Sequence, residues 1–160
     1  MMMTSNFSLI LQESAKIIIR HVTRGVELAK KHQLPAEITD FIKTHHGSRK
    51  VEYFYIKQKL ENPEKSVDEN NFTYPGPIPY SKETALVMMA DSVEAASRSL
   101  TKQDDASISE LVERIITRQL ESEQFSNADL TLRDITQVKE IFKKSLQNIY
   151  HIRISYPEEG

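Results

Sequence analysis

Apolar residues recur every three to four positions along most of the chain, which is the spacing of one face of an α-helix. The first stripe lies within residues 13–32, and its members are Ile18, Val22, Gly25, Val26 and Ala29. Two lysines follow it at positions 30 and 31, where positive charge stabilises the C-terminal end of a helix. The pattern therefore predicts a long first helix.

A second, shorter stripe begins after Pro35, because proline is well tolerated in the first turn of a helix. Its members are Ile38, Phe41, Ile42 and His45, at the i, i+3, i+4, i+7 spacing of an amphipathic helix. Gly47 is expected to end this helix. Residues 49–62 favour a third helix, although their aromatic cluster leaves a strand open.

Residues 61–80 interrupt the helical spacing. Four of the six prolines lie in this segment, and the run Pro75-Gly76-Pro77 cannot continue a helix. The segment is therefore predicted to be a Pro-rich loop or lid, and long loops in compact domains are often functional.

The C-terminal half returns to the helical spacing. Ser81 is expected to cap a helix over residues 82–100 that is almost continuously apolar through Asp91, so it is predicted to be buried on most sides. Two amphipathic helices follow, with apolar stripes at residues 108–120 and 135–149. Thr131 and Asp134 resemble a capping box before the second of them, and "IRISYPEEG" is expected to add a short extended tail.

The predicted fold class is thus all-α, a helical bundle in one domain spanning residues 1–160. This length suits a domain with a sizeable core, and 39% hydrophobic with 28% charged residues is typical of a soluble protein. A net charge of −2 gives no reason to expect a nucleic acid polymer as partner. The absence of cysteine excludes disulfides, thiolate nucleophiles and Cys-type zinc sites.

The chain also carries no mark of a membrane or secreted protein. No apolar run approaches the roughly 18 residues of a spanning helix, and "MMMTSNFSLILQ" does not read as a signal peptide. We therefore expect a cytoplasmic chain that makes no membrane contact itself.

Three polar features lie where apolar residues would be expected. His21 lies beside Ile18, one turn before Gly25, so it is either a ligand or a core histidine beside a tight helix crossing. His45 continues an apolar face, and His46 is rotated from it by about 100°. The two residues are therefore either metal ligands or histidines that stabilise the C-terminal end of the helix by interacting with its dipole. His32 and His151 are assigned no role.

Asp91 is the third feature, because it follows four apolar residues on the helix over residues 82–100. A carboxylate on such a surface should be paired, protonated or bound to a cation, and Arg98 two turns later offers a structural pair. Three histidines and one aspartate would form a nitrogen and oxygen metal site that activates water for attack on phosphorus. Arg49 and Lys50 add a basic rim that would attract a phosphate-bearing substrate, or are a solvated helix face.

Four blocks of the chain together resemble the HD-domain superfamily of metal-dependent phosphohydrolases. They are "ESAKIIIRHVTRGVELAKKHQLP", "DFIKTHHGS", "YPGPIPYSKETALVMMADSVEAASRSL" and "NIYHIRISYPE". The blocks are most similar to the cytosolic HD domain of bacterial seven-transmembrane HD phosphodiesterases that hydrolyse cyclic di-AMP. The resemblance runs from about Glu13 to Glu158, and residues 1–12 are expected to lie outside it or to be poorly ordered.

The resemblance implies a site that hydrolyses a cyclic dinucleotide by a metal-activated water. It implies His21, His45, His46 and Asp91 as metal ligands. Beside them, we expect the basic residues Arg49, Lys50 and Arg98 to bind the substrate. The implied cofactor is a divalent metal, iron or manganese, with magnesium or nickel as alternatives. In the parent protein this domain would lie on the cytosolic face of a membrane.

One departure from the superfamily bears on activity. None of the five histidines is followed by aspartate, so the His-Asp dipeptide that names the superfamily is missing. We therefore expect the C-terminal part of an HD domain that holds at most one metal and is inactive alone. The alternatives are a catalytically inactive interaction or nucleotide-sensing module, and a homodimer formed through an exposed helical surface.

Overall fold

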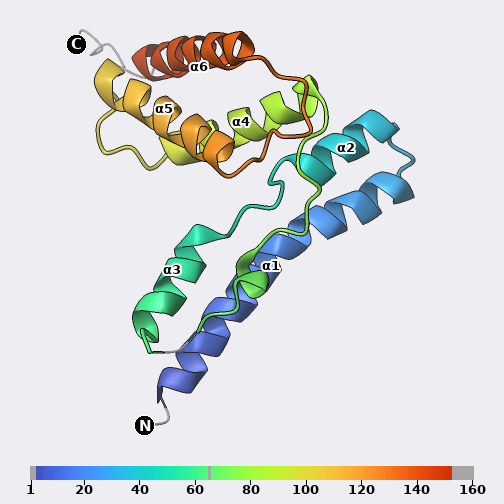
Figure 1. Cartoon of the computed structure of the whole chain (residues 1–160), viewed down its shortest axis with the longest axis vertical. Helices are drawn as coiled ribbons and strands as arrows, with labels where there is room; N and C mark the ends of the chain where they lie inside the picture. The colour runs from blue at the N-terminus through green and yellow to red at the C-terminus, as the bar shows by residue number, and fades with distance from the viewer. Residues whose placement is uncertain (1–2, 65, 153–160) are drawn as a thin grey trace, which may run out of the picture. The chain divides into compact units, whose positions relative to one another are not determined.

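The computed structural model describes residues 3–64 and 66–152, and it is helical as predicted (Figure 1). The elements are α1 (Met3–Lys31), α2 (Ala36–Thr44), α3 (Glu52–Glu61), the short 3₁₀ helix η1 (Glu69–Phe72), α4 (Lys82–Ser97), α5 (Asp105–Glu121) and α6 (Leu132–Ile152). The all-α class is therefore confirmed, and the strand left open for residues 49–62 is wrong. Helix α1 includes residues 3–12, which the sequence set apart, whereas the predicted tail lies outside the described residues from position 153 onward.

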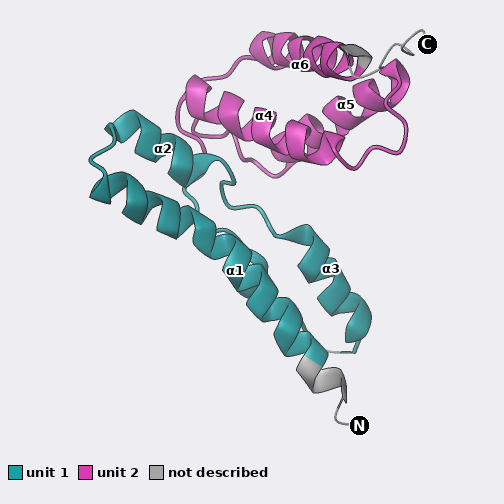
Figure 2. Cartoon of the chain, turned by 180° about the vertical axis from the view of Figure 1, so that it is seen from behind, with its two compact units in different colours: residues 1–78 teal, residues 79–160 magenta. Residues whose placement is uncertain are grey.

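The chain divides into two compact units, one up to Ile78 and one from Pro79 (Figure 2). The sequence predicts a single domain over the same residues. None of the described helices is both long enough and apolar enough to cross a bilayer.

The first unit is organised along α1, against which α2, α3 and η1 pack. The buried face of α1 consists of Leu11, Ala15, Val22 and Ala29, none more than 4% exposed. Gly25 lies where α1 meets α2, and a Cβ atom added to it would lie 2.8 Å from Cγ2 of Ile42. The tight crossing considered for Gly25 is therefore confirmed, because only a residue without a side chain fits there.

Part of the Pro-rich loop is paired with the residues that follow the double histidine. Lys50 and Thr73 form an isolated antiparallel bridge, the Val51 N–H donates to the Phe72 carbonyl at 2.7 Å, and the Tyr74 N–H donates to the Arg49 carbonyl at 2.9 Å. The side chains of Phe72 and Tyr74 are buried. This pairing ties residues 72–74 to the end of the histidine segment.

The second unit packs α4, α5 and α6 around a core that includes Met88, Met89, Val112 and Ile116, each of them fully buried. Its helix starts are capped as predicted. Ser81 and Thr84 form a capping box on α4. Before α6, the Asp134 N–H donates to the Thr131 hydroxyl at 3.1 Å and the Thr131 N–H donates to the Asp134 carboxylate at 2.9 Å.

The prediction that α4 is buried on most sides is wrong. Ala85, Met88, Met89 and Val93 are buried, but Leu86, Val87, Ala90 and Asp91 on the other side are exposed. Among the described elements of its unit, α4 packs against α5 and α6, which cover one stripe of its surface. The apolar composition of α4 therefore overstates how much of the helix is covered.

Candidate metal centre

Three of the predicted ligands, His21, His45 and His46, lie together in the first unit. His21 projects from α1, His45 caps the C-terminus of α2, and His46 follows in the turn that Gly47 closes with a positive φ of 53°. One ring nitrogen from each histidine lies within 4.8 Å of the others. We call these three residues the histidine triad. His21 is exposed and the other two are half-buried, so the interpretation of His21 as a core histidine is wrong.

The orientation of two rings in the triad is fixed by the helices that carry them. Nδ1 of His21 lies 2.5 Å from the Ile18 carbonyl oxygen, and Nδ1 of His45 lies 2.9 Å from that of Ile42. A carbonyl oxygen only accepts, so each Nδ1 must carry the proton and donate it. In a neutral imidazole the other nitrogen, Nε2, is then an unprotonated acceptor. This backbone contact is the arrangement that commonly orients a metal-ligating histidine.

The two unprotonated nitrogens face each other. Nε2 of His21 lies 3.1 Å from Nε2 of His45, which is hydrogen-bond distance between two atoms that, in the neutral rings, both accept. Two lone pairs at this distance repel unless a positive charge lies between them. The pair therefore favours either a shared proton or a cation, and the chemistry of three imidazole donors suits a divalent metal ion.

The third imidazole is held in its neutral form. Burial, and after it the neighbouring His45, His21 and Arg49, together lower the pKa of His46 to about 3. Near pH 7 the His46 ring is therefore uncharged, which is the state in which imidazole binds a metal. The residues of the triad thus fit a divalent cation both in geometry and in protonation.

Tyr74 adjoins the triad, although no sequence pattern assigned it a role. Its ring stacks on the His46 imidazole with centroids 4.3 Å apart and planes at 25°, and it meets the His21 ring edge-on at 6.0 Å. The Pro-rich loop has neither helical nor strand periodicity, so its sequence does not predict which way the side chain of Tyr74 points. The only signal was that Tyr74 begins the "YPGP" block of the resemblance.

Two arginines that lie beside His21 were also not predicted from the sequence to be part of the site. An open hollow of about 590 Å³ runs along α1 next to this histidine. It is lined by Ile17, Arg20, His21, Thr23, Arg24 and Glu27. Arg20 and Arg24 lie one turn apart, so they bring two positive charges to the side of the triad. On the sequence alone they are indistinguishable from the polar face of an amphipathic helix.

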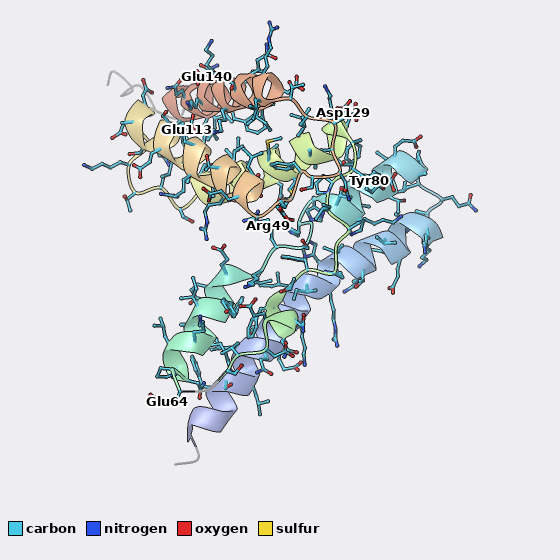
Figure 3. The ribbon with its side chains drawn as sticks, in the orientation of Figure 1. Arg49, Glu64, Tyr80, Glu113, Asp129 and Glu140 are labelled. Carbon is cyan, nitrogen blue, oxygen red and sulfur yellow. The ribbon has the colours of Figure 1, made fainter. Side chains whose placement is uncertain are left out.

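The predicted substrate-binding residues differ in their surroundings. Arg49, labelled in Figure 3, follows the double histidine closely enough for its charge to lower the pKa of His46. The ammonium of Lys50 instead pairs with Glu69 at 2.5 Å and lies over the Tyr55 ring. Arg98 pairs with Glu94 at 2.7 Å on the exposed side of α4. Of the two that lie in the same unit as the triad, Arg49 is the one whose charge acts on it.

Asp91, the fourth predicted ligand, lies on α4 in the second unit. Its side chain is exposed. The structural pair considered for Arg98 is made with Glu94. The role of Asp91 as a ligand stays a prediction.

Comparison with known proteins identifies relatives that match most of the chain. No family model matches it. The chain is 40% identical over 147 residues to the cyclic-di-AMP phosphodiesterase PgpH of Bacillus subtilis, and 38% identical over 148 residues to the PgpH of Listeria monocytogenes. Each match covers 92% of this chain and 20% of the relative, so the chain spans about a fifth of the length of these proteins.

Two solved structures of the HD domain of PgpH are also similar to this chain. The HD domain of the L. monocytogenes phosphodiesterase PgpH in complex with cyclic di-AMP matches with a TM-score of 0.84 and 38% identity, over 91% of this chain and 68% of that one. A second structure of that HD domain matches with a TM-score of 0.81 and 35% identity, over 88% of this chain and 65% of that one.

Proposed function

Since the chain belongs to the HD-domain family of the PgpH phosphodiesterases, we propose that it forms part of an active site that hydrolyses cyclic di-AMP. The relatives are named as phosphodiesterases, and one of the matching domains was solved with this dinucleotide. The similarity does not favour the alternative of an inactive interaction or sensing module.

The observation that carries the proposal is the pair of Nε2 atoms 3.1 Å apart in His21 and His45, with the neutral His46 beside them. These three imidazoles would hold a divalent cation, and Asp91 is proposed to add a carboxylate oxygen. Mixed imidazole and carboxylate ligands suit iron or manganese, which we propose as the metal. When bound, such a cation supplies Lewis acidity that polarises a phosphoryl oxygen and lowers the pKa of a water molecule.

The chain's own positive charges would bind the phosphate groups. Arg49 lies beside His46, and Arg20 and Arg24 line the hollow beside His21. A guanidinium presents two parallel N–H donors to a phosphate and keeps its charge at any pH of interest. These arginines would therefore orient the phosphodiester and offset its negative charge next to the triad.

A chimera of two related domains tests the proposal. This chain would replace the matching segment of the L. monocytogenes HD domain, and release of a linear dinucleotide from cyclic di-AMP would be followed by chromatography with Mn²⁺ added. The unaltered L. monocytogenes domain serves as the positive control. We expect the chimera to hydrolyse the substrate and His21→Ala in the chimera to lose nearly all of that activity.

His32→Ala is the matched control, because this histidine is exposed beyond the end of α1 and outside the triad. It should leave hydrolysis unchanged. A folded chimera without activity beside an active parent domain would refute the proposal, and so would equal loss in the two histidine variants.

A further inference from the structure

We infer that Tyr74 is a positioning residue for the metal site, because its ring fixes the plane of the His46 imidazole so that this ring can serve as the third ligand. The inference rests on the proposed function, since it concerns the cation that the histidine triad is proposed to hold. It assigns a structural task to a residue of the Pro-rich loop.

His46 lies at a different kind of backbone position from the other two imidazoles. His21 lies within α1 and His45 at the end of α2, and each is held by a backbone carbonyl one turn earlier in its own helix. His46 comes after the last residue of α2, where the backbone turns toward Gly47. Its ring lies against those of His45 and Tyr74, with centroids at 4.0 Å and 4.3 Å.

Tyr74 is itself fixed by the backbone that leaves the double histidine. Its N–H donates to the carbonyl of Arg49 at 2.9 Å, and the adjacent Thr73 pairs with Lys50. Its side chain is 8% exposed. A buried ring on a paired backbone has few alternative positions, so it offers a rigid surface to its neighbour.

Stacking suits this task chemically. It acts on the face of the imidazole, so it restrains the plane of the ring without occupying either nitrogen. The angle of 25° between the two rings is close to parallel, which gives a large contact between their faces. Outer contacts that orient a metal ligand typically change metal affinity by about 10–100-fold when they are removed.

The test measures metal affinity in the whole chain, with Co²⁺ as the probe and its visible absorption as the signal. Tyr74→Phe keeps the stacked ring and should bind Co²⁺ within about threefold of wild type. Tyr74→Leu removes the ring and should weaken binding by about 10–100-fold, with an altered Co²⁺ spectrum. If Tyr74→Leu does not fold by circular dichroism, Tyr74→Met takes its place, because methionine fills irregular apolar space.

Phe72→Leu separates positioning from stability. Phe72 is fully buried two residues away, and its ring packs against Tyr55. This variant should lower the melting temperature and leave Co²⁺ affinity near wild type. Wild-type affinity in Tyr74→Leu, or equal weakening in Phe72→Leu, would overturn the inference.

An NMR measurement on the metal-free wild type makes the test independent of any variant. The ring current of Tyr74 should shift the His46 ring protons upfield, and this shift should persist in Tyr74→Phe. Its absence would overturn the inference. A wild type that shows the shift but binds no divalent cation would instead refute the proposed function.

Discussion

Gly25→Ala should loosen the crossing of α1 and α2 that brings His21 to His45. The added Cβ would lie 2.8 Å from Cγ2 of Ile42, and an ordinary contact begins at 3.4 Å, so the two helices must separate by roughly 0.6 Å. Cγ2 belongs to a β-branched side chain with one strongly preferred rotamer in a helix, so it has little freedom to give way.

Two opposing contributions set the magnitude. Overpacking of this kind costs about 1–3 kcal/mol, whereas replacing a mid-helix glycine by alanine gains about 1 kcal/mol of helix propensity. We therefore expect a net loss of about 1 kcal/mol in the free energy of unfolding. Separating the helices would also move His21 away from His45, so metal affinity should fall as well.

A double-mutant cycle gives the assay. The free energy of unfolding would be measured by urea denaturation for Gly25→Ala, Ile42→Leu and the pair, with amide exchange in α1 and α2 to localise the effect. Leucine has no Cγ2, so Ile42→Leu should remove the close contact and recover about 1 kcal/mol in the double variant. A stabilised Gly25→Ala variant, as at an unobstructed helical glycine, would refute the reasoning.

Two further predictions concern the second unit. Hydrogen bonds from the Thr131 backbone and from Lys82 lower the pKa of Asp134 to about 2, so this carboxylate stabilises the folded state above pH 4 and the effect is lost as pH falls from 4 toward 2. Asp134→Asn should flatten that part of the plot of urea midpoint against pH. An unchanged slope in Asp134→Asn would contradict this explanation, and so would an equal flattening in the control Asp129→Asn, whose side chain is exposed. Glu113 accepts from Lys139 and Lys143, both at 2.7 Å, and these bonds lower its pKa. Glu113→Gln should cost about 0.5–1 kcal/mol at low salt and less in 1 M NaCl, and a loss that does not depend on salt would refute the ionic explanation.

The helices could be predicted because their signal is local. Apolar spacing located α2, α5 and α6. The cap residue Ser81 and the pair formed by Thr131 and Asp134 located two helix starts. The covered side of α4 could not be predicted in the same way. Apolar residues lie on every side of α4, so their spacing does not indicate which face is buried. The buried stripe is determined by packing against α5 and α6.

The triad was predictable only in part. Helical phase indicated that His45 faces the same side as Ile42, but the distance from His21 depends on two helices meeting at Gly25, which no local pattern gives. The family resemblance supplied that pairing. Tyr74 was not predictable, because its position depends on backbone pairing between residues 49–51 and 72–74, which are separated by α3.

A calorimetric titration of Mn²⁺ into the whole chain measures whether His21, His45 and His46 form one site for a divalent cation. We expect saturable binding of one ion per chain. Alanine at any member of the triad should weaken binding at least about tenfold, and His32→Ala should leave it unchanged. No saturable binding, or equal affinity in wild type and in a variant that lacks all three imidazoles, would contradict it.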